Sequence, residues 1–132
     1  MTEQNFIMQP TGFDICSEEG PCLTIIKPAR LLTQAPVHLD SLERRIKAYL
    51  KERDNKPGRV YLGVPHRLDR PVSGIMVFAK HARAAKRLSQ QFEGRMVEKR
   101  YWACVEGLLS PPEGEWVDSM RKIPGKSQAE MV

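Results

Sequence analysis

The sequence predicts an α+β fold in which one domain, residues 1–132, has a mixed, mainly antiparallel sheet with flanking helices. Short apolar runs typical of strands occur together with two stretches at helical spacing. These elements do not follow the regular strand–helix–strand order of parallel sheets. With 132 residues, of which 41% are hydrophobic and 28% charged, the chain can bury one core and does not fit a disordered or fibrous class.

The N-terminal half is expected to contain one strand and one helix. A β-branched run over residues 23–27 predicts a strand that ends at Pro28, and an extended loop follows as far as the next proline, at position 36. A helix should begin near Asp40 or Ser41, because Asp40 and Glu43 have capping-box spacing. The apolar residues at helical spacing are Leu39, Leu42, Ile46, Tyr49 and Leu50, and the pattern ends over residues 55–58.

The C-terminal half is expected to contain more strands and a second helix. Residues 60–64 predict one strand, and the apolar run 75–79 after Gly74 is typical of a strand buried on both faces. Helical spacing returns from His81 to Phe92, with Gly94 at the position of a C-cap. Alternation from Val97 to Val105 predicts another strand. We expect a short strand at residues 115–120 and a loop at 124–132.

The positive charge of the chain is concentrated in one segment. Residues 80–100 contain seven basic and two acidic side chains, so this segment accounts for the whole net charge of +5. Such a stripe favours a polyanionic partner, of which nucleic acid is the simplest, although a solvated helix face would have the same composition.

Several classes of site are not indicated. The three cysteines have no metal-ligand spacing, so we expect reduced, structural thiols and no metal. Glycine-rich nucleotide-binding motifs are absent, and no cofactor is expected. No window is long and apolar enough to span a membrane and no targeting segment is evident, so we expect a cytoplasmic protein.

The densest group of polar residues is the loop HRLDRPVSG at positions 66–74. Asp69 has Arg67 and Arg70 close to it in sequence, and this positive charge favours the carboxylate form. A carboxylate can attack a sugar carbon or act as a general base. The alternative is a turn aspartate in a surface ion pair, while Ser73 lacks a nucleophile-elbow motif and is interpreted as a turn residue.

This loop resembles the signature of the pseudouridine synthases of the RluA family. The similar stretch is HRLDRPVSGIMVFAK (66–80), and the flanking segments LTIIKPARLL (23–32) and VEKRYWACVEG (97–107) are similar to family blocks in the same order. With the helix between them included, the resemblance covers roughly residues 15–110. Three ordered blocks are a far more specific signal than one short motif. The resemblance implies an enzyme that isomerises uridine in rRNA or tRNA, with RNA as partner and with no cofactor or metal.

The resemblance also assigns roles to residues. Asp69 matches the catalytic aspartate, and Arg67 matches the arginine that takes the place of the flipped nucleotide. Tyr101 matches a tyrosine beside the uracil, and Lys27 matches a lysine that is structural or faces phosphate. The remaining expected RNA-binding residues are His66, Arg70 and Lys99.

The chain departs from the family pattern at three places. Val72 stands where the family has threonine, and Arg30 stands where a glycine usually follows Lys-Pro-Ala. The chain also ends before the family's C-terminal block, which supplies a basic partner for the aspartate, so we expect a C-terminal truncation. Two hypotheses follow: an RNA uridine isomerase, or a catalytically inactive RNA-binding fragment or homologue.

Overall fold

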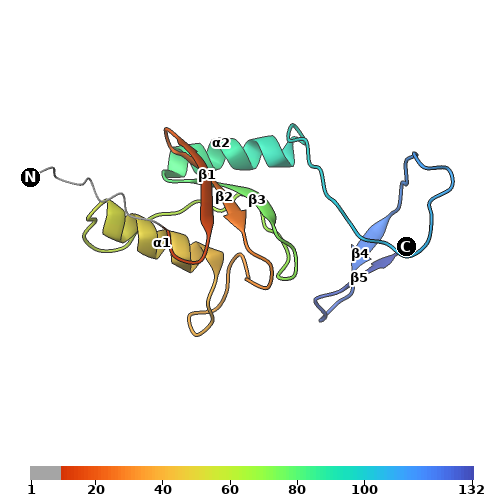
Figure 1. Ribbon diagram of the computed structural model, residues 1–132, viewed down its shortest axis with the longest axis horizontal. Helices are drawn as coiled ribbons and strands as arrows, with labels where there is room; N and C mark the ends of the chain where they lie inside the picture. The colour runs from red at the N-terminus through yellow and green to blue at the C-terminus, as the bar shows by residue number, and fades with distance from the viewer. Residues whose placement is uncertain (1–9) are drawn as a thin grey trace, which may run out of the picture. The chain divides into compact units, whose positions relative to one another are not determined.

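The computed structural model describes residues 10–132, which fall into two compact units divided after Lys99 (Figure 1). The first unit contains β1 (Asp14–Glu19), β2 (Cys22–Lys27), α1 (Leu42–Arg53), β3 (Gly74–Ala79) and α2 (Ala82–Glu93). The second unit contains β4 (Met120–Lys122) and β5 (Ala129–Met131). The elements confirm the predicted α+β class with antiparallel sheets.

The main sheet has the order β1-β2-β3, and both pairings are antiparallel. A tight turn containing Gly20, whose φ is 54°, joins β1 to β2. The strand predicted at residues 23–27 is confirmed as β2, whereas β1 was not predicted. The sequence of β1, DICSEE, is mostly polar and exposed, so it has no apolar pattern that would reveal a strand.

The core lies on one face of this sheet. Leu23 pairs in register with Phe78, and Ile25 with Met76, and all four side chains are fully buried. They share a cluster with the apolar side of α1, which consists of Leu42, Ile46, Tyr49 and Leu50. Leu39, which was grouped with these residues, is instead 42% exposed because it precedes the helix.

The opposite face of the sheet is partly open. Ile26 and Ile75 are direct partners in the register, and they are 39% and 65% exposed. The expectation that 75–79 would be buried on both faces is therefore wrong. An apolar run does not distinguish burial on one face from burial on two.

The start of α1 is capped by Ser41 rather than by Asp40. The Ser41 backbone is extended, and its Oγ accepts a hydrogen bond from the Arg44 N–H at 3.2 Å. Asp40 instead accepts two hydrogen bonds from the Arg45 guanidinium, at 2.6 and 2.9 Å. The helix begins where expected, but the predicted Asp40–Glu43 capping box is wrong.

Helix α2 begins and ends close to the predicted positions and packs near the end of β3. The strand predicted at 60–64 is reduced to a single bridge, in which Gly63 exchanges backbone hydrogen bonds with Ala79 at 2.7 and 3.0 Å. A Cβ on Gly63 would lie 2.4 Å from the Cβ of Ala85 in α2. The missing side chain at position 63 thus permits the close approach of the helix.

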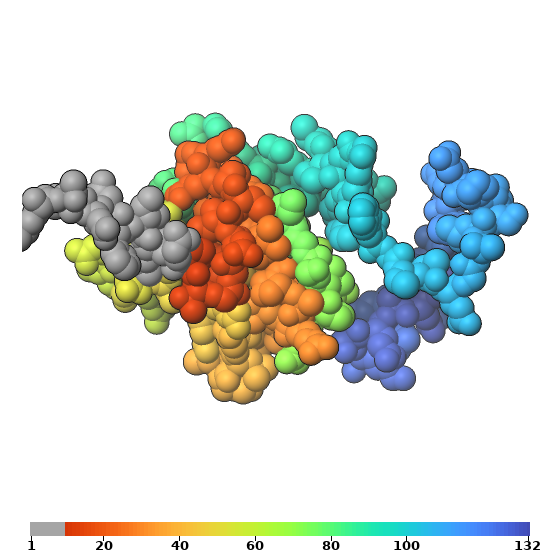
Figure 2. Space-filling model, viewed as in Figure 1, coloured from red at the N-terminus to blue at the C-terminus, as the bar shows by residue number. Residues whose placement is uncertain are grey.

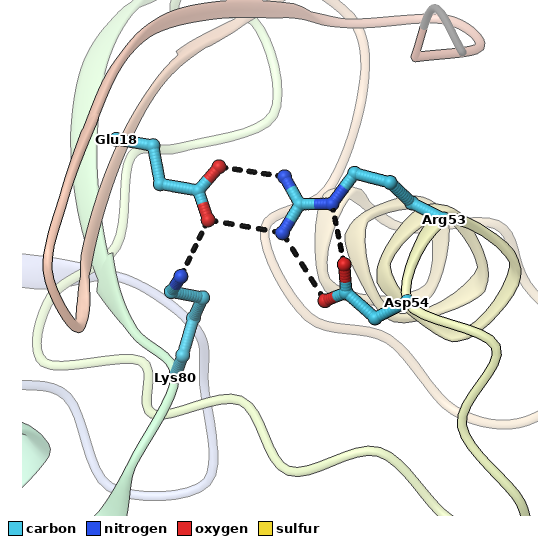
Figure 3. A network of polar contacts seen from close by, with 4 residues as sticks. All are labelled: Glu18, Arg53, Asp54 and Lys80. Atoms are coloured by element: carbon cyan, nitrogen blue, oxygen red, sulfur yellow. Dashed lines mark hydrogen bonds and ion pairs between the residues drawn. The ribbon is translucent and has the colours of Figure 1, made fainter. Parts of the chain in front are cut away.

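A polar network joins three elements of the first unit (Figure 3). Glu18 in β1 accepts hydrogen bonds from the Arg53 guanidinium at 2.6 and 2.9 Å and from Lys80, which follows β3. Arg53 also pairs with Asp54 at the end of α1. Because Arg53 and then Lys80 donate to its carboxylate, the pKa of Glu18 falls to about 2.

The second unit has little interior. Its short hairpin pairs Met120 with Met131, and no residue of this unit reaches the buried class. The predicted strand at 97–105 is absent, the one at 115–120 is displaced to β4, and the predicted loop 124–132 contains β5. The alternating pattern of 97–105 finds no ladder partner among residues 10–132, and a strand requires one.

Candidate active site

The loop of residues 66–73 leads from the segment that contains Gly63 to Gly74, the first residue of β3. Leu68 is buried in the core, whereas Arg67, Asp69 and Arg70 are exposed. The Val72 N–H donates to the Asp69 carbonyl at 3.0 Å and closes a turn. The loop is therefore anchored by Leu68, with Val72 partly buried against the same core, and it carries its three charged side chains at the surface.

Lys27, at the end of β2, fixes the loop from inside. Its side chain is fully buried, and Nζ donates to the carbonyls of Pro28, Leu31 and Arg70 at 2.9, 2.7 and 3.2 Å. Burial lowers the pKa of Lys27, and the Asp69 carboxylate acts in the opposite direction. Of the two expected roles, structural and phosphate-facing, only the structural one fits a side chain with no exposed surface.

His66 is also engaged by the protein. Its Nε2 accepts the Val77 N–H at 3.0 Å, and its ring stacks on Phe92 of α2 with centroids 4.5 Å apart. Burial, followed by the nearby Lys99 ammonium, lowers the pKa of His66. This neutral imidazole fastens the start of the loop to β3 and α2, so its acceptor nitrogen and one ring face are unavailable to RNA.

The predicted binding residues fall into both units. Lys99 is exposed, and its Nζ lies 5.5 Å from the ring centroid of Phe92, the same ring that stacks on His66. Arg70 donates from Nε to the Arg30 carbonyl at 3.4 Å. Tyr101 belongs to the second unit and is 62% exposed, and its expected place beside the target base stays a prediction.

Arg30 has a backbone conformation that favours glycine. Its φ is 67°, in the left-handed region, and the residue is exposed. The departure from the family's glycine therefore leaves the turn geometry intact and places a guanidinium on the segment that contacts the Asp69 loop.

The basic stripe is only partly available for a partner. Lys80 is paired with Glu18 (Figure 3). In contrast, Arg83, Lys86 and Arg87 are exposed on α2. Within residues 10–132, no group of three His, Cys, Asp or Glu side chains is arranged to hold a metal ion. No helix of this part of the chain has the length and apolarity of a membrane span, and the three cysteines are free thiols.

Sequence reasoning missed the segment that holds this loop in place. Figure 2 shows the orange chain after β2 beside the green chain that leads into β3. Thr33, in this segment, makes its hydrogen bonds to Leu68 of the loop, next to the contact from Lys27 at the end of β2. Thr33 lies in a proline-bounded loop with no periodic pattern, so nothing in the sequence distinguishes it. The resulting arrangement is an exposed carboxylate on a fixed backbone, with Arg67 and Arg70 as exposed neighbours in the sequence. Such a group can attack an electrophilic carbon or accept a proton close to a bound phosphate.

Comparison with known proteins gives a consistent result. A family described as RNA pseudouridylate synthase matches residues 22–131. A dual-specificity RNA pseudouridine synthase RluA of Vibrio vulnificus is 36% identical over 104 residues, covering 76% of this chain and 38% of that protein. A tRNA pseudouridine synthase C of Pectobacterium carotovorum is 36% identical over 103 residues, covering 76% of this chain and 26% of that protein.

A solved structure shares the fold. The human RNA pseudouridylate synthase domain containing 4 superposes with a TM-score of 0.69 at 24% identity, covering 89% of this chain and 50% of that chain. The chain thus spans 38% or less of the length of the two bacterial relatives above.

Proposed function

Because the chain belongs to the RNA pseudouridylate synthase family, we propose that it isomerises uridine to pseudouridine in RNA. One relative is named for tRNA and another for dual specificity, so we propose tRNA or rRNA as the substrate. We also propose the cytoplasm as the location. The observation that carries the proposal is the exposed Asp69 carboxylate, flanked by Arg67 and Arg70 on a loop with a fixed backbone.

The proposed reaction needs only a carboxylate. Asp69 attacks C1′ of the ribose or removes a proton from the sugar, and the bond between C1′ and N1 of uracil breaks. The freed uracil turns and joins C1′ through C5. As this bond forms, the bond between Asp69 and C1′ breaks, or the proton that Asp69 took returns to the sugar, so the carboxylate is regenerated. C5 then loses its proton and N1 gains one. Atoms and electrons balance within the nucleotide, so this reaction requires neither an oxidant nor a group donor.

The other residues would handle the RNA. Arg67 is suited to fill the space of the extruded nucleotide, because a planar cation both stacks and donates hydrogen bonds. Tyr101 would pack beside the uracil. Arg70 and Lys99 would contact phosphate, together with the exposed arginines of α2. The family match runs without interruption across both units, which supports our assignment of the whole chain to one catalytic domain.

A second candidate function is RNA binding without isomerisation. It is favoured by the exposed basic side chains Arg83, Lys86 and Arg87, which require no catalytic group to bind a phosphate backbone.

Tritium release from RNA labelled at C5 of uridine tests both candidates. The chain is compared with Asp69→Ala and with Asp118→Ala, a matched change at an exposed aspartate of the second unit. Release by the chain and by Asp118→Ala, but not by Asp69→Ala, supports isomerisation. RNA binding without release by any of them supports the second candidate, and the absence of both binding and release contradicts the two together.

A further inference from the structure

Thr33 is a buried polar residue that contacts the backbone beside the proposed catalytic aspartate. We propose that Thr33 is a positioning residue, whose hydroxyl fixes the backbone of Leu68 and so places Asp69 for reaction. This inference rests on the proposed function, because it concerns the same carboxylate.

The hydroxyl of Thr33 forms two hydrogen bonds with a single residue. Its Oγ1 accepts the Leu68 N–H at 3.2 Å and donates to the Leu68 carbonyl at 2.9 Å, and the residue is 3% exposed. The Sδ of Met76, at 3.8 Å, is a much weaker acceptor for the same proton. One side chain thus satisfies both polar groups of the residue directly before Asp69, which restricts the backbone on both sides of the Leu68 Cα.

The Thr33 backbone is itself fixed by a helix. The Leu42 and Glu43 N–H groups, in the first turn of α1, donate to the carbonyls of Leu32 and Thr33 at 2.8 and 3.0 Å. These donors have no partner within the helix, so the loop supplies it. Hydrogen bonds therefore connect the Leu68 backbone to Thr33, and Thr33 to the first turn of α1.

Asp69 is restrained on its other side by independent contacts. Lys27 donates to the Arg70 carbonyl at 3.2 Å, and the Val72 N–H donates to the carbonyl of Asp69 itself at 3.0 Å. Without the Thr33 hydroxyl, this second set and the burial of the Leu68 side chain would remain, but no hydrogen bond would hold the Leu68 backbone to the segment before α1. A displacement of about 1 Å in a reacting group can lower a rate by about a hundredfold.

The test compares Thr33→Val, which keeps the shape and removes both hydrogen bonds, with Thr33→Ser, which keeps the hydroxyl. Thr24→Val is the matched control, at a partly buried strand position outside the proposed site. Two quantities are measured: the ¹⁵N order parameter of the Asp69 amide, and kcat and KM for tritium release. We expect Thr33→Val to lower kcat at least about tenfold at nearly constant KM and to lower the order parameter from about 0.85 to below about 0.6. Thr33→Ser and Thr24→Val should stay within about threefold of the unchanged chain in kcat.

Two results would overturn the inference: wild-type order and kcat in Thr33→Val, or equal damage in Thr33→Ser, which would show that the hydroxyl is not what matters. Failure of the proposed function would appear separately, as the absence of release from the unchanged chain. In that case the order parameter alone decides: a loss in Thr33→Val but not in Thr33→Ser supports positioning of the loop, and no loss contradicts it.

Discussion

Replacing Lys27 with methionine should destabilise the protein more than any surface substitution. Methionine fills nearly the same space but leaves three carbonyl oxygens, those of Pro28, Leu31 and Arg70, without the donor that now binds them at 2.9, 2.7 and 3.2 Å. The variant therefore measures how much the buried ammonium contributes to the segment that supports Asp69.

The expected magnitude follows from these contacts. An unsatisfied buried polar group costs about 1–3 kcal/mol, so three carbonyls, two of them part-buried, give a gross loss of about 4 kcal/mol. Burial disfavours the charged form of Lys27, as its lowered pKa shows, and the neutral methionine side chain avoids this cost. That gain offsets about 1 kcal/mol, and we expect a net loss of about 3 kcal/mol in the free energy of unfolding.

Urea denaturation at pH 7 measures this loss, and Lys47→Met is the control. Lys47 is 40% exposed and lies 3.3 Å from Glu43, so its replacement should cost less than about 0.5 kcal/mol. Equal losses in the two variants would refute the reasoning.

The pH dependence gives a second measurement on Lys27→Met. The folded-state pKa of Lys27 lies below its ordinary value of 10.5. At pH values between these two pKa values, the unfolded chain binds more protons than the folded protein. Stability of the unchanged protein should gain a contribution as pH rises through this window, and Lys27→Met should lack it.

Three further substitutions test other features. Glu18→Gln should cost about 1 kcal/mol at pH 7, after discounting for solvent screening, and the difference should vanish as the pH falls from 4.5 toward about 2; an unchanged difference at pH 2 would be contrary evidence. In urea denaturation the unchanged protein should lose stability as the pH falls below 6.5, because the folded-state pKa of His66 is lowered. His66→Phe keeps the ring stack but has no titrating group, so it should not show this loss. Arg30→Gly should raise stability by about 0.5–1 kcal/mol because it relieves a φ of 67°, and a lower Tm would argue against that conformation.

The elements whose signals lie in local sequence were predicted well. The helix over residues 42–53 and the strand at residues 23–27 have apolar periodicity and clear stop signals, and both were found close to the expected bounds. The polar loop around Asp69 was placed correctly for the same reason, since two apolar segments enclose it.

Features that depend on partners far away in the sequence could not be predicted. Residues 97–105 alternate like a strand, yet a strand forms only where a neighbour offers its backbone groups. Conversely, β1 has no apolar pattern and exists because it pairs with β2. The burial of Lys27 depends on three carbonyls, the most distant being Arg70, 43 positions away in the sequence, so its sequence neighbours alone do not predict it.

The scarcity of interior in residues 100–132 has a calorimetric consequence. Heat absorbed on unfolding comes mainly from the separation of packed groups, and it averages about 0.7 kcal/mol per residue near 60 °C. A chain of 132 residues with uniform packing would absorb about 90 kcal/mol. Among residues 10–132 the buried ones all lie before position 100, so the enthalpy of melting should be close to about 70 kcal/mol, the value for a protein three quarters as long.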